Sequence, residues 1–385
     1  MVEQETTLLR QAGHDVVEYL RESDEIERFS AMRRLELPAR VVWSREDARM
    51  VTDLARRSRP DIVHIHNTFP LISPSVIRRL AALEIPIVMT LHNPRLFCAN
   101  AMLFRDGRPC EDCVGSSPLP GLVHACYRDS RIATAPITAS IAVHQRLDTW
   151  RRVATFITPS AFLRTKVAQG GLPLDRVVVK PNFVPAPART RERPGSHHLF
   201  LGRLSPEKGP DLLVSAWDAR FGRLLVAGEG PLRSTLDRTD VARGGVRFLG
   251  HRTAAECSDL LRSARALVVP SRVYEVFPVA VAEAFAHGVP VIAPAHGPFP
   301  DIVEDGVTGL LFEPGDTADL ARCLGAVLDD SLSMRLGAQA RRVYEAQYTP
   351  ERNLRSLESI YAGVLGRQGP FGRVPAPVTA EEAGS

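Results

Sequence analysis

Short runs of apolar and β-branched residues alternate with amphipathic stretches along most of the chain. In the first half, segments 61–66, 86–91 and 154–158 have the pattern of buried strands, and residues 74–83 have helical spacing. The second half repeats this pattern, with strands expected at 198–201, 224–227, 246–249, 266–269 and 289–293. Strands that alternate with helices in this way predict parallel sheets in α/β domains.

The start of the chain departs from this pattern. Leu8, Leu9 and Ala12 predict a helix that ends in a glycine cap at Gly13, with a strand expected at 16–17. An α/β domain of this kind usually opens with a strand and a Gly-rich turn before its first helix, and neither precedes this helix. We therefore expect either that the first sheet lacks a strand, or that the reading frame begins upstream of Met1.

Length and composition predict how the chain is divided into domains. A chain of 385 residues is too long for one ordinary core, which predicts two domains. The proline-rich segment 181–196 sustains neither a helix nor a central strand, so it is predicted to link a domain at 1–180 to one at 197–349. A final helix is expected at 350–366, and a disordered tail at 367–385.

One carboxylate lies in an unusually apolar helical run. Glu283 has only Val, Ala and Phe as its neighbours from 279 to 286, so no polar face is available to it. Burying an unpaired charge costs several kcal/mol, which a bound ligand would offset. The other reading is a surface helix with one glutamate facing solvent.

A second glutamate, Glu275, precedes the same helix by one turn. Phe277 and Pro278 follow it, and proline at a first helical turn predicts that the helix opens there, near Val279. A helix N-terminus offers free N–H groups and a positive dipole end to an anionic ligand.

Two cations are predicted to lie in a loop at the carboxyl end of a strand, where open α/β sheets bind ligands. Arg203 and Lys208 follow Gly202, and together they would hold a diphosphate, although a solvated loop is the simpler alternative. Gly228 begins a Gly-x-Gly turn that lacks the third glycine of a dinucleotide fingerprint. The sequence contains no Asp-x-Asp, so it supplies no metal clamp of that type.

Taken in order, the second-half motifs resemble those of the retaining glycosyltransferases of family 4, over about residues 3 to 365. The motifs are Gly202-Arg-Leu, Glu207-Lys-Gly209, Gly228-Glu-Gly-Pro231, Phe248-Leu-Gly250, Pro270-Ser271, Glu275-x7-Glu283 and Gly306-Val-Thr-Gly-Leu-Leu-Phe-Glu-Pro-Gly-Asp316. The resemblance implies two Rossmann-like domains that face each other across a cleft, the GT-B fold. One departure is Gly297-Pro-Phe-Pro-Asp301, where the family commonly has Gly-Gly-x-x-Glu.

The resemblance also implies residue roles. Arg203 and Lys208 would bind the donor diphosphate, Glu283 the ribose hydroxyls, and Glu275 the donor hexose near its reacting carbon. The backbone N–H groups after Phe277 would face the distal phosphate. In the first domain, Thr90-Leu-His-Asn93 resembles the family's His-Asp or His-Asn turn, so His92 would orient the acceptor hydroxyl or the donor sugar; a structural role for His92 is equally open. His64 and His66 are expected to be core or cleft-lining residues.

Four of the six cysteines fall within 29 residues, with a Cys-x2-Cys at the centre: Cys98, Cys110, Cys113 and Cys126. A four-thiolate structural zinc site, a disulfide or redox pair, and unliganded thiols all remain open. Cys257 and Cys323 are expected to be core thiols on helices.

The function that the resemblance implies is transfer of a hexose from a UDP- or GDP-sugar to a glycan or polyprenyl-linked acceptor, with no cofactor needed for catalysis. Bacterial envelope or exopolysaccharide synthesis is the expected setting. A non-catalytic subunit that binds a partner transferase and a Rossmann oxidoreductase are the alternatives. Residues 1–180 hold 25 basic against 20 acidic residues, which allows peripheral contact with the inner membrane face by an otherwise cytoplasmic protein. The sequence has no basic stripe with interleaved aromatic residues, so no nucleic-acid partner is expected.

Overall fold

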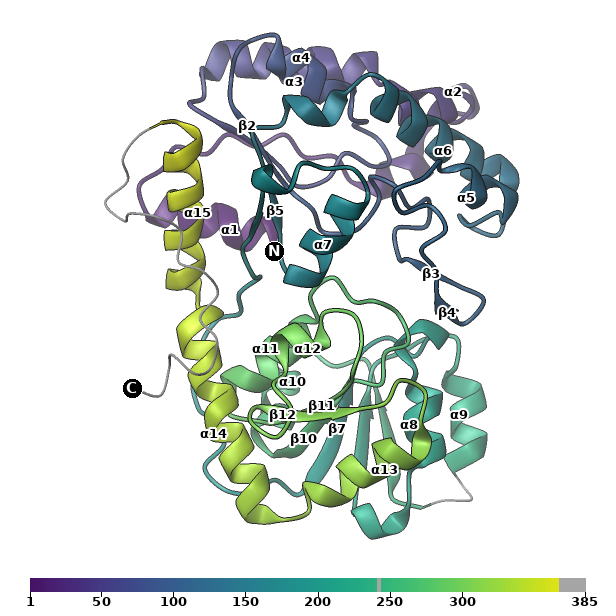
Figure 1. The fold of residues 1–385 in the computed structure, drawn as a ribbon, viewed down its shortest axis with the longest axis vertical. Coiled ribbons are helices and arrows are strands. Elements are labelled where there is room, and N and C mark those ends of the chain that lie inside the picture. The colour runs from purple at the N-terminus through teal and green to yellow at the C-terminus, as the bar shows by residue number, and fades with distance from the viewer. Residues whose placement is uncertain (241–243, 367–385) are drawn as a thin grey trace.

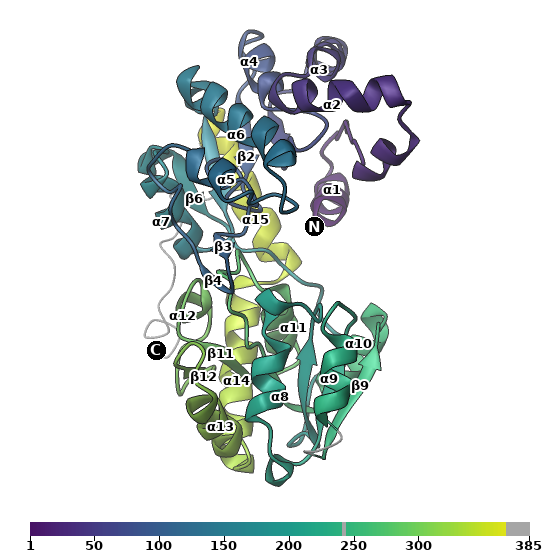
Figure 2. The same cartoon turned by 90° about the vertical axis from the view of Figure 1, so that its right-hand side faces the viewer.

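The computed structural model describes residues 1–240 and 244–366 as two lobes, one above the other in Figure 1. Each lobe contains a parallel sheet with helices packed around it, as the alternating pattern predicts, and Figure 2 shows the same two lobes from the side. The segment predicted to be a disordered tail, 367–385, lies outside the described residues.

The first domain is built on a four-stranded parallel sheet in the order β1-β2-β5-β6. Its strands are β1 (Val63–Ile65), β2 (Ile87–Thr90), β5 (Thr155–Thr158) and β6 (Val177–Val179). The strands predicted at 61–66, 86–91 and 154–158 are therefore present, shortened by one to three residues. A small antiparallel hairpin is added by β3 (Phe104–Arg105) and β4 (Arg108–Pro109). The helices are α1 (Val2–Gln11), α2 (Ala31–Val42), α3 (Arg45–Ser58), α4 (Ser75–Ala81), α5 (Leu119–Val123), α6 (Arg131–Arg146) and α7 (Ala161–Gln169).

The strand expected at 16–17 is not formed, and this prediction was wrong. The backbone there continues without regular structure from α1, and Val17 is exposed instead of lying in a sheet. The glycine cap before it is present: Gly13 has φ 90°, and the His14 N–H donates to the Leu9 carbonyl.

The second domain has a six-stranded parallel sheet in the order β12-β11-β10-β7-β8-β9. The strands are β7 (His197–Leu201), β8 (Leu224–Ala227), β9 (Val246–Gly250), β10 (Ala264–Val268), β11 (Val291–Pro294) and β12 (Gly309–Phe312). Five of these match the predicted strands closely, and β12 is an addition. The helices are α8 (Pro210–Ala216), α9 (Arg233–Asp240), α10 (Ala254–Arg262), α11 (Val279–Ala286), α12 (Phe299–Ile302), α13 (Thr317–Ala326) and α14 (Asp330–Gln347).

The last helix leaves the second domain and packs on the first. α15 (Pro350–Val364) follows α14 and lies beside α1 at the left of Figure 1. Its Leu357 and Ile360 are buried in one cluster with Leu9, Val88 and Ile157. Tyr361 adds a polar tie, since its hydroxyl lies 2.7 Å from Nδ1 of His64.

The interdomain segment 181–196 has no regular structure, but it is not a free linker. The Val184 N–H donates to the Tyr348 carbonyl at 3.1 Å, and Nδ2 of Asn353 donates to the Pro181 carbonyl at 2.9 Å. The chain therefore passes between the lobes twice, and the two passages are hydrogen-bonded to each other.

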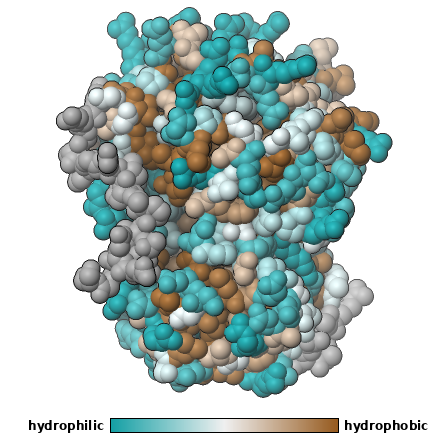
Figure 3. Space-filling view, viewed as in Figure 1, coloured by the Kyte–Doolittle hydropathy of each residue, from teal (hydrophilic) through white to brown (hydrophobic). Residues whose placement is uncertain are grey.

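Polar side chains cover most of the face shown in Figure 3, with apolar surface in separate patches on both lobes. Within residues 1–240 and 244–366, none of the helices combines the length and the apolar content that spanning a bilayer requires.

Candidate active site

The strand order of the second sheet reverses between β7 and β10. β8 and β9 follow one another on one side of β7, whereas β10 pairs with the other side of β7. In open α/β sheets such a reversal separates the two loops that follow the strands and creates a ligand crevice. The loops at this point are residues 202–209 after β7 and 269–278 after β10.

Two of the predicted site residues meet in this crevice. Lys208 Nζ lies 2.6 Å from Oε1 of Glu275, and the same oxygen accepts a hydrogen bond from Ser271 at 2.7 Å. The Glu275 side chain is 13% exposed and the Lys208 side chain 34%. An ammonium that is partly open to solvent can turn to a second anion while it still neutralises Glu275.

The two loops are held together by contacts that the sequence did not reveal. Arg272 forms a bidentate ion pair with Asp211, both distances being 2.7 Å, and its backbone N–H donates to the Glu207 carbonyl. Gly209 has φ 65°, and a Cβ there would lie 2.1 Å from the Pro270 carbonyl oxygen. The glycine and the ion pair together fix the position of Lys208 relative to Glu275.

The N-terminus of α11 faces the end of the same loop. Phe277 is buried, Pro278 is the N-cap, and the helix begins at Val279, where the proline predicted it to open. The Val281 N–H donates to the Pro278 carbonyl, whereas no acceptor within the described chain takes the N–H groups of Val279 and Ala280. These two donors and the helix dipole are available to an anion.

Glu283 lies on α11 with no side-chain hydrogen bond or ion pair to any described residue. Its side chain is half-buried, and burial raises the pKa of the carboxyl above its usual range. A half-buried carboxylate without a partner is the arrangement that the apolar run predicted, and it suits a hydroxyl donor supplied by a ligand.

The other residues predicted to bind the donor lie in the turns after β7 and β8. Arg203 is exposed, and its side chain forms no hydrogen bond or ion pair within the described residues. Gly228 has φ 140°, and a Cβ there would lie 1.9 Å from the carbonyl oxygen of Gly202. The structure thus brings the backbones of Gly202 and Gly228 into close approach. Pro231 follows the Gly228 turn, and α9 begins two residues later at Arg233.

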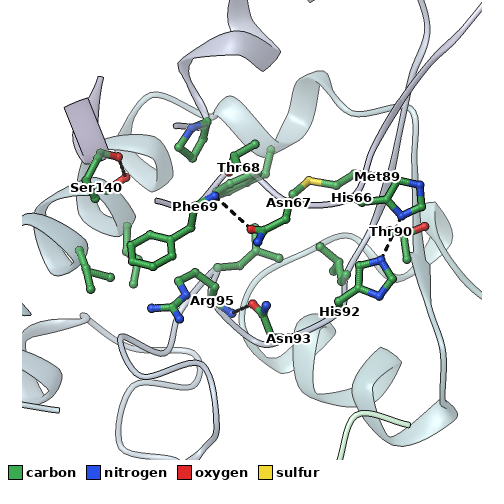
Figure 4. A pocket seen from close by; sticks show the side chains of 17 residues that line it. His66, Asn67, Thr68, Phe69, Met89, Thr90, His92, Asn93, Arg95 and Ser140 are labelled. Atoms are coloured by element: carbon green, nitrogen blue, oxygen red, sulfur yellow. Dashed lines mark hydrogen bonds between the residues drawn. The ribbon is translucent and has the colours of Figure 1, made fainter. Parts of the chain in front are cut away.

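A pocket in the first domain opens at the carboxyl ends of β1 and β2 (Figure 4). His66 follows β1 and His92 follows β2, and Nδ1 of His66 lies 3.0 Å from Nε2 of His92. Burial lowers the pKa of both rings, that of His66 to about 4, so both are neutral at pH 7. His92 therefore lies at a pocket, where a neutral imidazole can accept or donate one hydrogen bond.

Arg95 is a second polar feature of this pocket. Its guanidinium stacks 4.1 Å from the Phe69 ring centroid and donates to the Ala99 carbonyl at 2.5 Å. No carboxylate of the described chain pairs with it, and burial lowers its pKa. An unneutralised, half-buried cation beside apolar side chains favours a bound anion.

A buried ion pair that the sequence analysis did not predict supports the histidines. Glu5 of α1 and Lys180, just after β6, are both buried and bonded to each other, and the second Glu5 oxygen lies 3.6 Å from Nε2 of His66. Lys180 is one of three lysines in the chain, which was the available signal. His64 is structural, since Thr90 and Tyr361 occupy its two ring nitrogens.

The four clustered cysteines line a second pocket, which we call the cysteine pocket: Cys98, Cys110, Cys113 and Cys126. All are free thiols, and burial raises the pKa of Cys113 to about 11. Cys323 is fully buried in α13, as expected of a core thiol, whereas Cys257 is only half-buried in α10 and lies outside the hydrophobic core.

Two family models match this chain in succession. The model described as Glycosyltransferase Family 4 matches residues 2–186, and the one described as Glycosyl transferases group 1 matches residues 195–330. This chain belongs to glycosyltransferase family 4. The unmatched gap between the two models falls within the segment that joins the two lobes.

Curated relatives support the family 4 assignment. The chain is 29% identical to a glycogen synthase of Mycobacterium tuberculosis over 306 residues, which cover 74% of this chain and 64% of that protein. It is 33% identical to a D-inositol 3-phosphate glycosyltransferase of Salinispora arenicola over 189 residues, or 44% of this chain and 42% of the relative. The chain thus spans less than two thirds of the length of these relatives.

Solved structures share the GT-B fold of this family 4 chain. A sucrose-phosphate synthase from Thermosynechococcus elongatus has a TM-score of 0.65 at 17% identity, over 95% of this chain and 92% of that one. Anabaena HepE in complex with UDP has a TM-score of 0.60 at 17% identity, over 82% of each chain. The expected arrangement of two Rossmann-like domains is confirmed.

Proposed function

We propose that the protein is a retaining glycosyltransferase that moves a hexose from a UDP- or GDP-sugar to a glycan or polyprenyl-linked acceptor. The observation that carries the proposal is the Lys208–Glu275 pair at the reversal point of the second sheet, beside the N-terminus of α11. A cation, a carboxylate and free backbone donors in one crevice match the needs of a sugar diphosphate.

In the proposed donor complex, Lys208, Arg203 and the first N–H groups of α11 bind the diphosphate. Glu283 accepts hydrogen bonds from the ribose, which gives its half-buried carboxylate a partner. The bond between the sugar and the distal phosphate breaks, and the electron pair stays on the phosphate oxygen. Glu275 stabilises the positive charge that develops on the sugar.

The acceptor oxygen attacks from the face that the phosphate leaves, and its proton passes to the departing phosphate. This route retains the configuration and needs no covalent nucleophile on the protein. His92 would orient the acceptor hydroxyl or the donor sugar, since its neutral ring lies at the first-domain pocket. The His66 ring, hydrogen-bonded to it, would fix its orientation.

The proposed donor is supported by similar solved structures, and the proposed acceptor by the first-domain pocket. Structures of HepE were solved with UDP and with UDP-glucose, which favours a uridine donor as the first to test. The first-domain pocket combines apolar side chains with the unneutralised Arg95, which suits an acceptor that carries a phosphate beside an apolar chain. Such an acceptor fits envelope or exopolysaccharide synthesis, with the protein cytoplasmic and peripheral at the inner membrane face.

The proposal is tested by screening UDP- and GDP-sugars for donor hydrolysis and for transfer to polyprenyl phosphate and glycan acceptors. We expect one donor to be turned over, with Glu275→Ala removing most of the turnover. An enzymatic role is refuted if no donor binds or is hydrolysed, and binding without turnover would favour the non-catalytic subunit.

A further inference from the structure

The fold brings together four thiols from separate points of one 29-residue segment of the first domain. Cys98 follows β2, Cys110 and Cys113 follow the β3–β4 hairpin, and Cys126 follows α5, yet all four line the cysteine pocket. Convergence of four of the six cysteines on one pocket is not required by the sheet, which is formed by residues outside this segment.

The segment between Cys98 and Cys126 has little regular structure, although Leu103 is buried in the core of the first domain. Its regular structure consists of two two-residue strands and the five-residue α5, whose Leu119 and Val123 are 56% and 53% exposed. Several non-glycine residues take left-handed conformations, namely Ala101, Leu103, Asp106 and Ala125. Each costs of order 1–3 kcal/mol, and such conformations persist only where the surroundings impose them.

We propose that the cysteine pocket binds one structural zinc ion. Four cysteine sulfurs with a Cys-x2-Cys pair at the centre are the ligand set of a closed tetrahedral site, and the metal would hold the segment where apolar burial does not. A closed site has Zn–S bonds of about 2.3 Å, which places its sulfurs about 3.8 Å apart. In the described chain the cysteines form no group of three within 4.8 Å of one another, so binding would draw the hairpin inward.

Another trio of possible ligands is less suitable. Glu5, His64 and His66 have ligand atoms within 4.8 Å of one another, but the Lys180 ammonium already occupies Glu5. Both ring nitrogens of His64 are also hydrogen-bonded. A cation there would compete with a buried ammonium. The cysteine pocket is also lined by Arg105 and Asp112, but these two side chains pair with each other at 2.9 Å.

A short chain of contacts connects the cysteine pocket to the proposed donor site. Glu111 lies between Cys110 and Cys113 and forms an ion pair with Lys166 at 2.7 Å. The Lys166 ammonium lies over the Phe162 ring, which in turn packs 4.9 Å from the ring of Tyr274, the neighbour of Glu275. This inference about the metal does not depend on the proposed transfer reaction.

The test is metal analysis of full-length protein purified without chelator from zinc-supplemented cells. We expect about one zinc per chain, and six titratable thiols once the protein is denatured with EDTA. Cys110→Ser combined with Cys113→Ser should lower the zinc content at least tenfold, and Cys257→Ser should leave it unchanged. Protein that carries no zinc, with all thiols free or with four of them oxidised to disulfides, overturns the proposal.

Cobalt substitution covers the case in which the double variant fails to fold. Wild-type protein stripped of metal and titrated with Co²⁺ should develop the intense visible bands and sulfur-to-cobalt charge-transfer absorption of a tetrahedral thiolate site at one equivalent. A weak octahedral spectrum instead would exclude the four-sulfur ligand set.

Discussion

The Lys208 ammonium is shared, in the absence of donor, between Glu275 and the solvent. Its removal takes away one phosphate contact and leaves Glu275 without its counter-ion. We expect Lys208→Ala to weaken UDP-sugar binding about 10- to 100-fold, since a charge-assisted hydrogen bond contributes roughly 1.5–3 kcal/mol. Calorimetric titration with the nucleotide sugar measures this effect. Arg322→Ala, which removes an exposed cation elsewhere on the same domain, is the control.

Glu275→Ala should separate chemistry from binding. The carboxylate is proposed to act on charge that develops in the transition state, so kcat should fall about 10²- to 10³-fold while the donor Kd changes little. Steady-state kinetics with the active donor and a parallel binding titration give both values. Near-normal kcat in this variant would remove Glu275 from the mechanism.

The proposed contact between Glu283 and the donor ribose can be tested through the pH dependence of stability. Burial raises the folded-state pKa of this carboxyl, so the folded protein binds more protons than the unfolded chain as the pH rises past 4.5. Stability is therefore lost as the pH rises from 4.5 through the folded pKa. Glu283→Gln should remove that loss, giving a higher Tm than wild type at pH 7.5 but a similar Tm near pH 4. Its UDP affinity should fall about tenfold, and an unchanged affinity would contradict the assignment.

At the scale of single elements, β7 carries a buried histidine that makes the second domain sensitive to acid. His198 is fully buried, its ring lies 5.3 Å from that of Trp217, and burial lowers its pKa to about 4. The unfolded chain binds a proton near pH 6.5, so stability falls as the pH drops from 6.5 to 4, by about 3 kcal/mol for this residue.

His198→Phe should flatten that acid dependence. Urea unfolding at pH 7 and pH 4.5 would show a smaller difference between the two pH values than in wild type. The exposed His251→Asn serves as the matched substitution and should behave like wild type. An unchanged difference in His198→Phe would mean that other groups control the acid response.

Most strands of the two parallel sheets were predictable because they follow from local periodicity. The second-domain strands were placed within a residue or two, and the alternation alone gave the fold class. The strand at 16–17 failed because two β-branched residues signal a strand only if a partner edge pairs with them, which no local pattern encodes. For the same reason, the hydrogen bond between Tyr361 of α15 and His64 could not be predicted from local patterns.

Within the candidate site, the sequence identified residues whose chemistry is unusual for their surroundings. Glu283 stood out because its helix is otherwise apolar, and Lys208 because lysine is rare in this chain. Arg272 and Asp211 were missed, since their pairing depends on two loops that approach only in the folded sheet. The Glu5–Lys180 pair joins residues 175 positions apart and was equally invisible to motif reasoning.

At the scale of the whole molecule, α15 ties the lobes together through apolar contacts. Leu357 is 1% exposed at the centre of its contact with the first domain. Leu357→Ala should cost about 2–5 kcal/mol, because truncating a buried leucine removes apolar burial and leaves a cavity. Scanning calorimetry should show a lower first transition, and Arg355→Ala, exposed on the same helix, should not. Nucleotide binding by the second domain should survive in both variants.

The paired passages between the lobes restrict how the molecule can open. With Val184 bonded to Tyr348 and Pro181 to Asn353, both crossings lie along one side, so relative rotation of the lobes pivots there. Displacement then grows with distance from that pivot and is greatest near the β3–β4 hairpin, on the opposite side in Figure 1. A bulky acceptor of the proposed reaction would enter between the lobes from the hairpin side. Cross-linking the two lobes on that side should therefore block transfer to such an acceptor.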